Sequence, residues 1–284
     1  MMEKNIHTFI ACDHAYEDSS IVLFGAPFDS TTSYRPGTRF ASSAIRNESF
    51  GLETYSPYLN RDLTEIQVYD GGDLELPFGS PQQALEDIET YTKKVLRDGK
   101  LPLMIGGEHL VTLGAVRAVS AAYPDLHILH FDAHADLRDE YLGVMLSHAT
   151  VMHRCWELVG NGRIFQFGIR SGDKSEFVWG AEHVSTCKFT FDTLEETIQE
   201  LKDKPIYVTV DLDVLDPSVF PGTGTPEAGG VSFEELRRAI ELIGKHCNVV
   251  AADMNELSPI YDQSGASTAV ACKILREMLL SLHK

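Results

Sequence analysis

The stretch LHILHFDAHAD (126–136) joins an apolar run to three ionisable residues that lie two positions apart, Asp132, His134 and Asp136. In an extended chain, side chains two positions apart point to the same side, whereas on a helix His134 would face away from the other two. If the chain stays extended here, two carboxylates and one imidazole therefore point together. We expect a buried strand that ends in a polar cluster with a chemical role.

Similar short apolar runs recur along the chain, and helical patterns lie between many of them. Continuously apolar runs are typical of parallel strands that are buried on both faces. The expected strands cover residues 19–25, 65–70, 101–106, 126–131, 163–168, 183–189, 205–211 and 248–254. The clearest helices are expected at 81–100, after Ser80 and Pro81, at 232–246, with Ser232 and Glu235 in capping-box spacing, and at 267–284. This alternation predicts one α/β domain over residues 1–284, with a mostly parallel sheet and helices on both faces.

The composition limits the classes of partner. The formal net charge is −18, which argues against nucleic acid, since nucleic-acid binding requires basic patches. Acidity favours a cationic ligand by long-range steering, although it could equally serve solubility alone. No apolar run approaches the roughly 18 residues of a membrane span, and the start of the chain lacks a signal-peptide core. Five cysteines without a C-x-x-C pair indicate a reduced intracellular chain, so we expect a cytoplasmic protein with no membrane partner.

Four of the expected strands are followed by ionisable residues, and in parallel sheets ligands bind beyond these carboxyl ends. The residues concerned are Glu108 and His109 after 101–106, Asp132, His134 and Asp136 after 126–131, Asp211, Asp213 and Asp216 after 205–211, and Asp253 and Glu256 after 248–254. Carboxylates that are packed together repel one another at low dielectric, and cations are the usual remedy. Taken singly, each motif could instead be a surface turn, a salt-bridge cluster or a helix start.

The residue types indicate which cation would bind. Four Asp and two His without Cys form an oxygen-rich ligand set that suits Mn²⁺ or a similar divalent ion better than structural zinc. Four carboxylates carry four negative charges, which two divalent ions would balance. Two metals that share carboxylates can also hold a hydroxide, which is a nucleophile near neutral pH.

The order of the motifs resembles that of the ureohydrolases, the arginase–agmatinase family. The matching segments are GAPFDSTTSYRPGTRFASSAIR (25–46), GGEH (106–109), FDAHAD (131–136), SHAT (147–150), DLDVLDP (211–217), GTGTPEAGG (222–230) and MNELSP (254–259). The resemblance implies a three-layer αβα fold with an eight-stranded parallel sheet, two Mn²⁺ ions per chain, and hydrolysis of a guanidino group to urea and an amine. Because the family usually forms trimers or hexamers, it also implies a homo-oligomer.

The resemblance also assigns roles to individual residues. It implies that one metal is held by His109, Asp132, Asp136 and Asp211, and the other by Asp132, His134, Asp211 and Asp213, with Asp132 and Asp211 bridging. His148 matches the proton-shuttle histidine, and Glu256 matches the acid that holds the guanidinium. Asp216 is expected to be a turn residue, and Glu108 and Asp253 are expected to support the site.

The loop LRDEYLGVMLSHAT (137–150) bears on the choice of guanidino substrate. It lacks the Asn that the family uses to hold the α-carboxylate of arginine, and it resembles the loop of bacterial agmatinases. Asp139 and Glu140 should tolerate an amine tail better than a carboxylate tail, so we expect agmatine, which would give putrescine. Arg138 keeps a carboxylate tail such as that of guanidinobutyrate open, and Glu227 is a further candidate to meet an ammonium.

Three other classes fit the sequence less well. A binuclear phosphatase should carry Arg or Lys beside the metals, and the four strand ends supply none. Deacetylases of this fold use one zinc and a paired histidine, and no His-His occurs in the sequence. A metal-binding protein without catalytic activity would not need His148 and Glu256.

Overall fold

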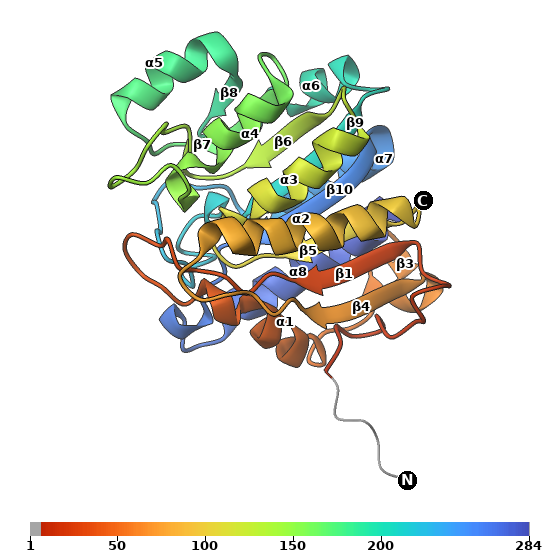
Figure 1. Cartoon of the computed structure of the whole chain (residues 1–284). Coiled ribbons are helices and arrows are strands. Elements are labelled where there is room, and N and C mark those ends of the chain that lie inside the picture. The colour runs from red at the N-terminus through yellow and green to blue at the C-terminus, as the bar shows by residue number, and fades with distance from the viewer. Residues whose placement is uncertain (1–6, 284) are drawn as a thin grey trace.

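Eight parallel strands form the central sheet of the computed structural model, which describes residues 7–283 (Figure 1). The strands are β1 (Ile21–Gly25), β4 (Val68–Asp73), β5 (Leu101–Ile105), β6 (His127–Phe131), β7 (Ile164–Ile169), β8 (Ser185–Lys188), β9 (Pro205–Asp211) and β10 (Asn248–Asn255). Their order is β4-β1-β5-β10-β9-β6-β7-β8, and every neighbouring pair is parallel. All eight predicted runs are therefore strands. A separate antiparallel pair joins β2 (Tyr55–Ser56) to β3 (Arg61–Asp62).

Helices cover both faces of the sheet, which confirms the predicted three layers. One layer contains α2 (Pro81–Arg97), α3 (Val111–Ala122), α4 (Val151–Val159) and α5 (Lys174–His183), and the other contains α1 (Ala41–Ser49), α6 (Leu194–Glu200), α7 (Phe233–His246) and α8 (Ala266–Leu282). In Figure 1, α2 and α3 lie in front of the sheet, and α7 and α8 lie behind it. Within residues 7–283, five short 3₁₀ helices occupy Thr38–Phe40, Leu63–Glu65, His148–Thr150, Leu212–Val214 and Pro259–Tyr261. No described helix combines the length and apolarity that a membrane span requires.

The helix starts follow the local signals in part. The Ser232 hydroxyl accepts a hydrogen bond from the Glu235 N–H at 3.3 Å, and the Glu235 carboxylate accepts one from the Ser232 N–H at 2.8 Å. The predicted capping box of α7 is thus confirmed. Ser80 precedes α2 as expected, but its side chain makes no capping hydrogen bond, so Pro81 is the stronger start signal there.

Each central strand contributes to two cores because alternate side chains point to opposite faces. In β9, Val208 and Val210 pack in the core under α7 and α8, whereas Tyr207 packs in the core under α2 and α3. The second face becomes polar toward the carboxyl ends of the strands. There Thr209 on β9 and Asp253 on β10 are fully buried.

Two glycines set the path of the chain from β5 toward α3. A Cβ on Gly107 would lie 2.0 Å from the Phe28 carbonyl oxygen, and one on Gly106 would lie 1.7 Å from the Asn255 side chain. Only glycine permits this close approach of the backbone. The approach fixes the path of the chain just before His109, which comes two residues after Gly107. The path of this loop is therefore determined by packing against its neighbours.

We expect Gly107→Ala to destabilise the metal-free protein by about 1–3 kcal/mol, because the added methyl must displace the Phe28 backbone. Metal affinity should fall as well, since His109 moves with the loop. Urea unfolding in the presence of a chelator, followed by metal analysis after dialysis, tests both effects. Gly51→Ala is the matched control, because a Cβ added there would come no closer than 3.3 Å to another heavy atom, the Glu48 carbonyl oxygen. Wild-type stability together with full metal content in Gly107→Ala would contradict the packing argument.

Candidate functional site

The four polar strand ends meet at one edge of the sheet. Strands β5, β10, β9 and β6 are consecutive neighbours and run in the same direction, so their carboxyl ends lie side by side. At this edge lie the residues that the sequence singled out as metal ligands: His109, Asp132, His134, Asp136, Asp211 and Asp213.

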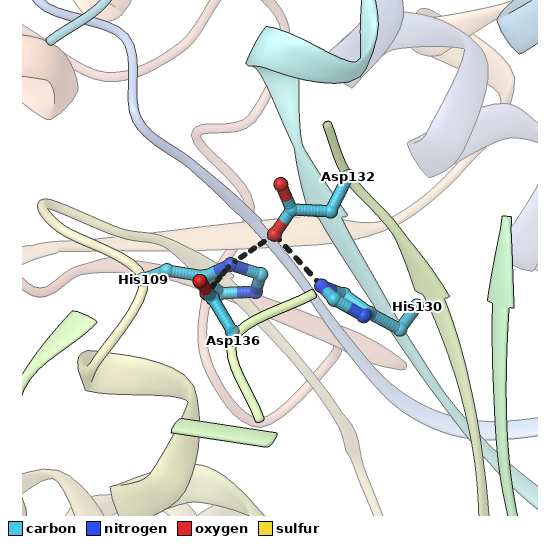
Figure 2. A group of neighbouring side chains, drawn as sticks. All are labelled: His109, His130, Asp132 and Asp136. Atoms are coloured by element: carbon cyan, nitrogen blue, oxygen red, sulfur yellow. Dashed lines mark hydrogen bonds and ion pairs between the residues drawn. The ribbon is translucent and has the colours of Figure 1, made fainter. Parts of the chain in front are cut away.

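Asp132 lies at the centre of this cluster, and its two oxygens face different histidines. Its Oδ2 lies 2.9 Å from Nδ1 of His109, and its Oδ1 lies 3.5 Å from Nδ1 of His134. Figure 2 shows the carboxylate of Asp132 directed at His109 and His130, with Asp136 beside His109. The Asp132 carboxylate therefore belongs to two groups of potential ligands at once.

The two groups differ in composition. In the first, Nδ1 of His109 also lies 3.3 Å from the Oδ2 atoms of Asp136 and Asp211. In the second, Nδ1 of His134 lies 3.1 Å from Oδ2 of Asp213. The other oxygen of Asp211 accepts a hydrogen bond from the Asp213 N–H at 2.9 Å, which ties the two groups together on the β9 side.

The backbone of the D-x-H-x-D segment is not extended throughout. Asp136 has φ of 54°, in the left-handed region, and His134 makes an isolated bridge to Ser171. Simple alternation along a strand therefore does not explain why the three side chains converge. The turn at Asp136 directs its carboxylate to His109 instead.

Burial and like charges dominate the electrostatics of the cluster. Burial raises the pKa of Asp136 to about 7, and the Asp132 carboxylate adds to the shift. Burial, followed by the carboxylates of Asp213 and Asp132, holds the pKa of Asp211 well above its usual range. For Asp132 burial opposes ionisation, but hydrogen bonds from three histidines outweigh it and hold its pKa well below the usual range.

The donor set fits a pair of cations. His109, Asp132 and Asp136 offer ligand atoms within 4.8 Å of one another, and so do Asp132, His134 and Asp213. Imidazole and carboxylate are hard or borderline ligands, and divalent cations relieve the repulsion among the carboxylates. The cluster is therefore able to form a binuclear metal site, with Asp132 common to the two groups of ligands.

His130 belongs to the same cluster, although the sequence interpretation did not include it. It is fully buried, its Nε2 lies 2.8 Å from Oδ2 of Asp132, and its Nδ1 lies 3.0 Å from the Gln166 side-chain nitrogen. It comes two residues before Asp132, and that spacing alone could have placed the two side chains on one side of an extended chain. His130 orients the central carboxylate.

A buried polar network contacts the His109 ring on the side opposite to Asp132. Nε2 of His109 lies 2.8 Å from the Thr209 hydroxyl. Next to it, Asp253 accepts hydrogen bonds from the Thr112 hydroxyl at 2.8 Å and from the Tyr207 hydroxyl at 2.5 Å. Asp253 thus supports the site from the polar face of the sheet, as expected.

His148 begins a 3₁₀ helix and faces a loop that follows β1. Its Nδ1 lies 3.0 Å from the Thr31 carbonyl oxygen, and because a carbonyl only accepts, Nδ1 carries the proton. Nε2 then accepts from the Ser33 hydroxyl at 3.2 Å. Burial lowers the pKa of His148 to about 4, so the ring is neutral at pH 7, with Nε2 as its acceptor nitrogen.

The loop that contacts His148 is held by Glu108. This carboxylate is fully buried and accepts hydrogen bonds from the Thr31 hydroxyl at 2.6 Å, the Thr31 N–H at 3.0 Å and the Thr32 hydroxyl at 3.0 Å. The expected supporting role of Glu108 is thus directed at the His148 side of the site. Asp216, in contrast, is a turn residue that accepts hydrogen bonds from Ser218.

Glu256 follows β10 and is buried next to the first group of ligands. One of its oxygens accepts a hydrogen bond from the His109 N–H at 2.7 Å. Burial, followed by the carboxylates of Asp213 and Glu108, holds the pKa of Glu256 well above its usual range. The charged form of Glu256 would be favoured by a cation beside it.

A cavity of about 340 Å³ opens beside the cluster. The residues that line it include His134, Asp136 and His148, and also Arg138, Tyr141, Ser171, Asp173 and Glu176. The cavity is thus lined by members of the ligand cluster, by the candidate proton shuttle and by charged side chains from two loops.

The acidic residues that line the cavity are not those that the sequence suggested. Asp139 forms an ion pair with Arg154 on α4, and Glu140 is exposed, so neither lines the cavity. Asp173 and Glu176, at the start of α5, carry the negative charge instead. Glu227 lies next to two of the lining residues: it accepts a hydrogen bond from the Ser171 hydroxyl at 2.9 Å, and its carboxylate is 3.9 Å from Nε2 of His134.

Comparison with known proteins gives a consistent result. The model of the arginase family matches residues 19–281. The agmatinase of Bacillus subtilis (strain 168) is 47% identical over 280 residues, which cover 97% of this chain and 96% of that protein. A crystal structure of a Clostridium difficile protein is 52% identical, with a TM-score of 0.93 over 95% of this chain and 99% of that one.

A third relative extends the similarity. The crystal structure of the agmatine ureohydrolase of Thermoplasma volcanium is 35% identical, with a TM-score of 0.89 over 98% of this chain and 94% of that one. A family model that matches nearly the whole chain and relatives that match over nearly their whole lengths lead to one conclusion. The chain belongs to the arginase family.

Proposed function

We propose that this protein is a ureohydrolase that hydrolyses agmatine to putrescine and urea, acting as a single domain over residues 1–284. The observation that carries the proposal is the paired ligand cluster around Asp132, because two of its members, His134 and Asp136, line a cavity that His148 also lines. The similarity to an agmatinase over 97% of the chain supports the same reaction. The direct test is urea release, with Mn²⁺ present, from agmatine, arginine, guanidinobutyrate and guanidinopropionate.

The cofactor that we propose is a pair of Mn²⁺ ions. One would be held by His109, Asp132, Asp136 and Asp211, and the other by Asp132, His134, Asp211 and Asp213. An oxygen-rich set with two imidazoles and no thiolate is well suited to manganese. Two such ions supply a hydroxide near neutral pH for attack on the guanidino carbon.

The protein side chains would hold the substrate and move its protons. The Glu256 carboxylate would accept hydrogen bonds from the planar guanidinium and so fix the position of its carbon. When the C–N bond to the alkyl amine breaks, the leaving nitrogen needs a proton. His148 would accept at Nε2 the proton that the attacking hydroxide oxygen loses as urea forms and would pass it to that nitrogen, while the Thr31 carbonyl holds Nδ1–H in place.

From the family resemblance we infer that the protein is cytoplasmic and forms a homo-oligomer, a trimer or a hexamer. Its binding partner would be the small cationic substrate, and we expect it to bind neither nucleic acid nor membranes. Putrescine as a product would place the reaction in polyamine synthesis. Light scattering of the purified protein measures the assembly directly.

A change at a ligand that both ions would share should weaken both metal sites and the activity together. Asp211→Asn removes one charge from the carboxylates that both ions would share, so metal content after dialysis should fall below two equivalents and activity should nearly vanish. Asp216→Asn is the matched control, because it removes the same charge five residues along, in a turn. Two equivalents of metal and normal turnover in Asp211→Asn would disprove the bridging role.

His148→Ala should keep both metals but lose at least about tenfold in kcat, since general acid–base help contributes roughly 10²–10⁴-fold and water replaces part of it. His246→Ala, an exposed histidine at the end of α7, is the control. Metal analysis and steady-state kinetics with agmatine are the measurements. A wild-type kcat in His148→Ala would remove this residue from the mechanism.

Glu256→Gln keeps the shape of the side chain and removes its charge. Breaking a buried ion pair with the guanidinium costs ~3–5 kcal/mol, so kcat/KM for agmatine should fall on the order of 10²–10³-fold with metals retained. Kinetics and metal content must be measured on the same sample. Near-normal kcat/KM would exclude the guanidinium role, and a large loss of metal would make Glu256 a structural support for His109.

A further inference from the structure

A row of four polar side chains crosses the sheet near the carboxyl ends of β7, β6, β9 and β10. Each member lies opposite the next one in register, and in this strand order they are Gln166, His130, Thr209 and Asp253. All four are fully buried. Thr209 contacts the ring of His109, and Gln166 contacts the ring of His130. The row therefore reaches both imidazoles that face Oδ2 of Asp132.

The Gln166 side chain determines which nitrogen of His130 carries the proton. Its Nε2 lies 2.7 Å from the Ala135 carbonyl oxygen, and because a carbonyl only accepts, this atom is the amide nitrogen and donates. The amide oxygen accepts a hydrogen bond from the Thr186 hydroxyl at 3.0 Å. The same Nε2 lies 3.0 Å from Nδ1 of His130, so its second hydrogen is donated there. Nδ1 of His130 is thus an acceptor, and the ring proton is on Nε2.

This tautomer makes His130 a hydrogen-bond donor and excludes it as a metal ligand. Its Nε2 donates to Oδ2 of Asp132 at 2.8 Å (Figure 2). Distance alone would permit the other role, since His130 offers a ligand atom within 4.8 Å of those of His109, Asp132 and Asp136. An imidazole nitrogen binds a metal only through a free lone pair, and a protonated nitrogen has none.

Each oxygen of Asp132 accepts one N–H group from the protein. Oδ2 accepts from Nε2 of His130, and Oδ1 accepts from the backbone N–H of His134 at 2.6 Å. A carboxylate oxygen has two lone pairs, so one remains free on each oxygen. A carboxylate that bridges two cations needs this division, because each oxygen must serve one of them.

Gln166 also holds the segment that carries two further ligands. Ala135, whose carbonyl is the other acceptor of the Gln166 amide, lies between His134 and Asp136. The left-handed turn at Asp136 follows directly. One buried amide group therefore fixes both the ring beside Asp132 and the backbone of the D-x-H-x-D segment.

We propose that Gln166 is a positioning residue that makes Asp132 a bridging ligand, because it holds His130 in the tautomer that donates to Oδ2. One lone pair on each Asp132 oxygen is then left for a cation. This inference rests on the proposed pair of metal ions and adds to it two residues that do not bind them. Substitutions of Gln166 and His130 should therefore change the metal affinity but not the number of imidazole ligands.

Two substitutions of His130 distinguish a donor from a ligand. A Gln side chain places its amide nitrogen near the position of the imidazole Nε2, so His130→Gln keeps the donor, whereas His130→Leu removes it. The affinity of the metal-free protein for Mn²⁺, titrated by calorimetry without substrate, should fall about tenfold or more in His130→Leu and stay within about threefold in His130→Gln. Wild-type affinity in His130→Leu, or an equal loss in both variants, would overturn the inference.

Electron spin-echo spectroscopy of bound Mn²⁺ counts the imidazole nitrogens that coordinate the metal. Wild type and His130→Gln should give the same count. The loss of one imidazole nitrogen in His130→Gln would make His130 a ligand and would also overturn the inference.

Gln166→Met keeps the length of the side chain and removes its two amide hydrogens. The affinity for Mn²⁺ should again fall about tenfold or more, as is usual when a group that orients metal ligands is lost. Ser56→Ala is the control, because it removes a fully buried hydroxyl that donates to Glu277 at 2.7 Å between β2 and α8. This control should lower stability without changing the affinity. Wild-type affinity in Gln166→Met would exclude the positioning role.

Nitrogen-15 NMR of the wild-type protein with labelled histidine rings reads the tautomer directly. His130 is assigned by the signals that disappear in His130→Gln. Its Nδ1 should give the signal of a bare nitrogen and its Nε2 that of a protonated one, and a proton on Nδ1 would overturn the inference. Failure of the proposed function has a different signature, because the wild-type protein would then release no urea. The NMR spectrum and the Mn²⁺ titrations need no substrate and still decide the role of Gln166.

Discussion

The organisation of the site follows from the gathering of like charges around Asp132. Carboxylates from the loop after β6, from the end of β9 and from the 3₁₀ helix after β9 approach two histidines that face separate oxygens of Asp132. Such an arrangement is unfavourable in a buried place unless cations or protons neutralise it. The parallel sheet makes the arrangement possible, because it brings the ends of four strands to one edge. The rest of the molecule near this edge holds the charged groups in position.

The supporting devices are of two kinds, one steric and one polar. Gly106 and Gly107 allow the backbone before His109 to pack directly against its neighbours. Glu108, between those glycines and His109, holds the Thr31 loop and thereby the ring of His148. One short segment after β5 therefore contributes both to the metal cluster and to the group that is proposed to move protons.

The sequence predicted the eight strands and the clustering of their polar ends because both depend on local patterns: apolar runs, two-residue spacing and the direction of parallel strands. It did not predict the left-handed turn at Asp136, since the D-x-H-x-D spacing is equally compatible with an extended chain. The interpretation of Asp139 was wrong because its partner, Arg154, lies on a helix that follows the loop. Asp173 and Glu176 were missed because they reach the cavity only through the pairing of the segment after β7 with residues 133–135.

The rings of His109 and His130 are oriented by the protein itself. Thr209 contacts the far nitrogen of His109, and Gln166 contacts the far nitrogen of His130. Both partners belong to strands of the sheet, so the sheet itself fixes how the two rings are turned. A metal ion bound at this cluster would therefore meet rings that are already oriented, and its binding would not require the side chains to find new rotamers.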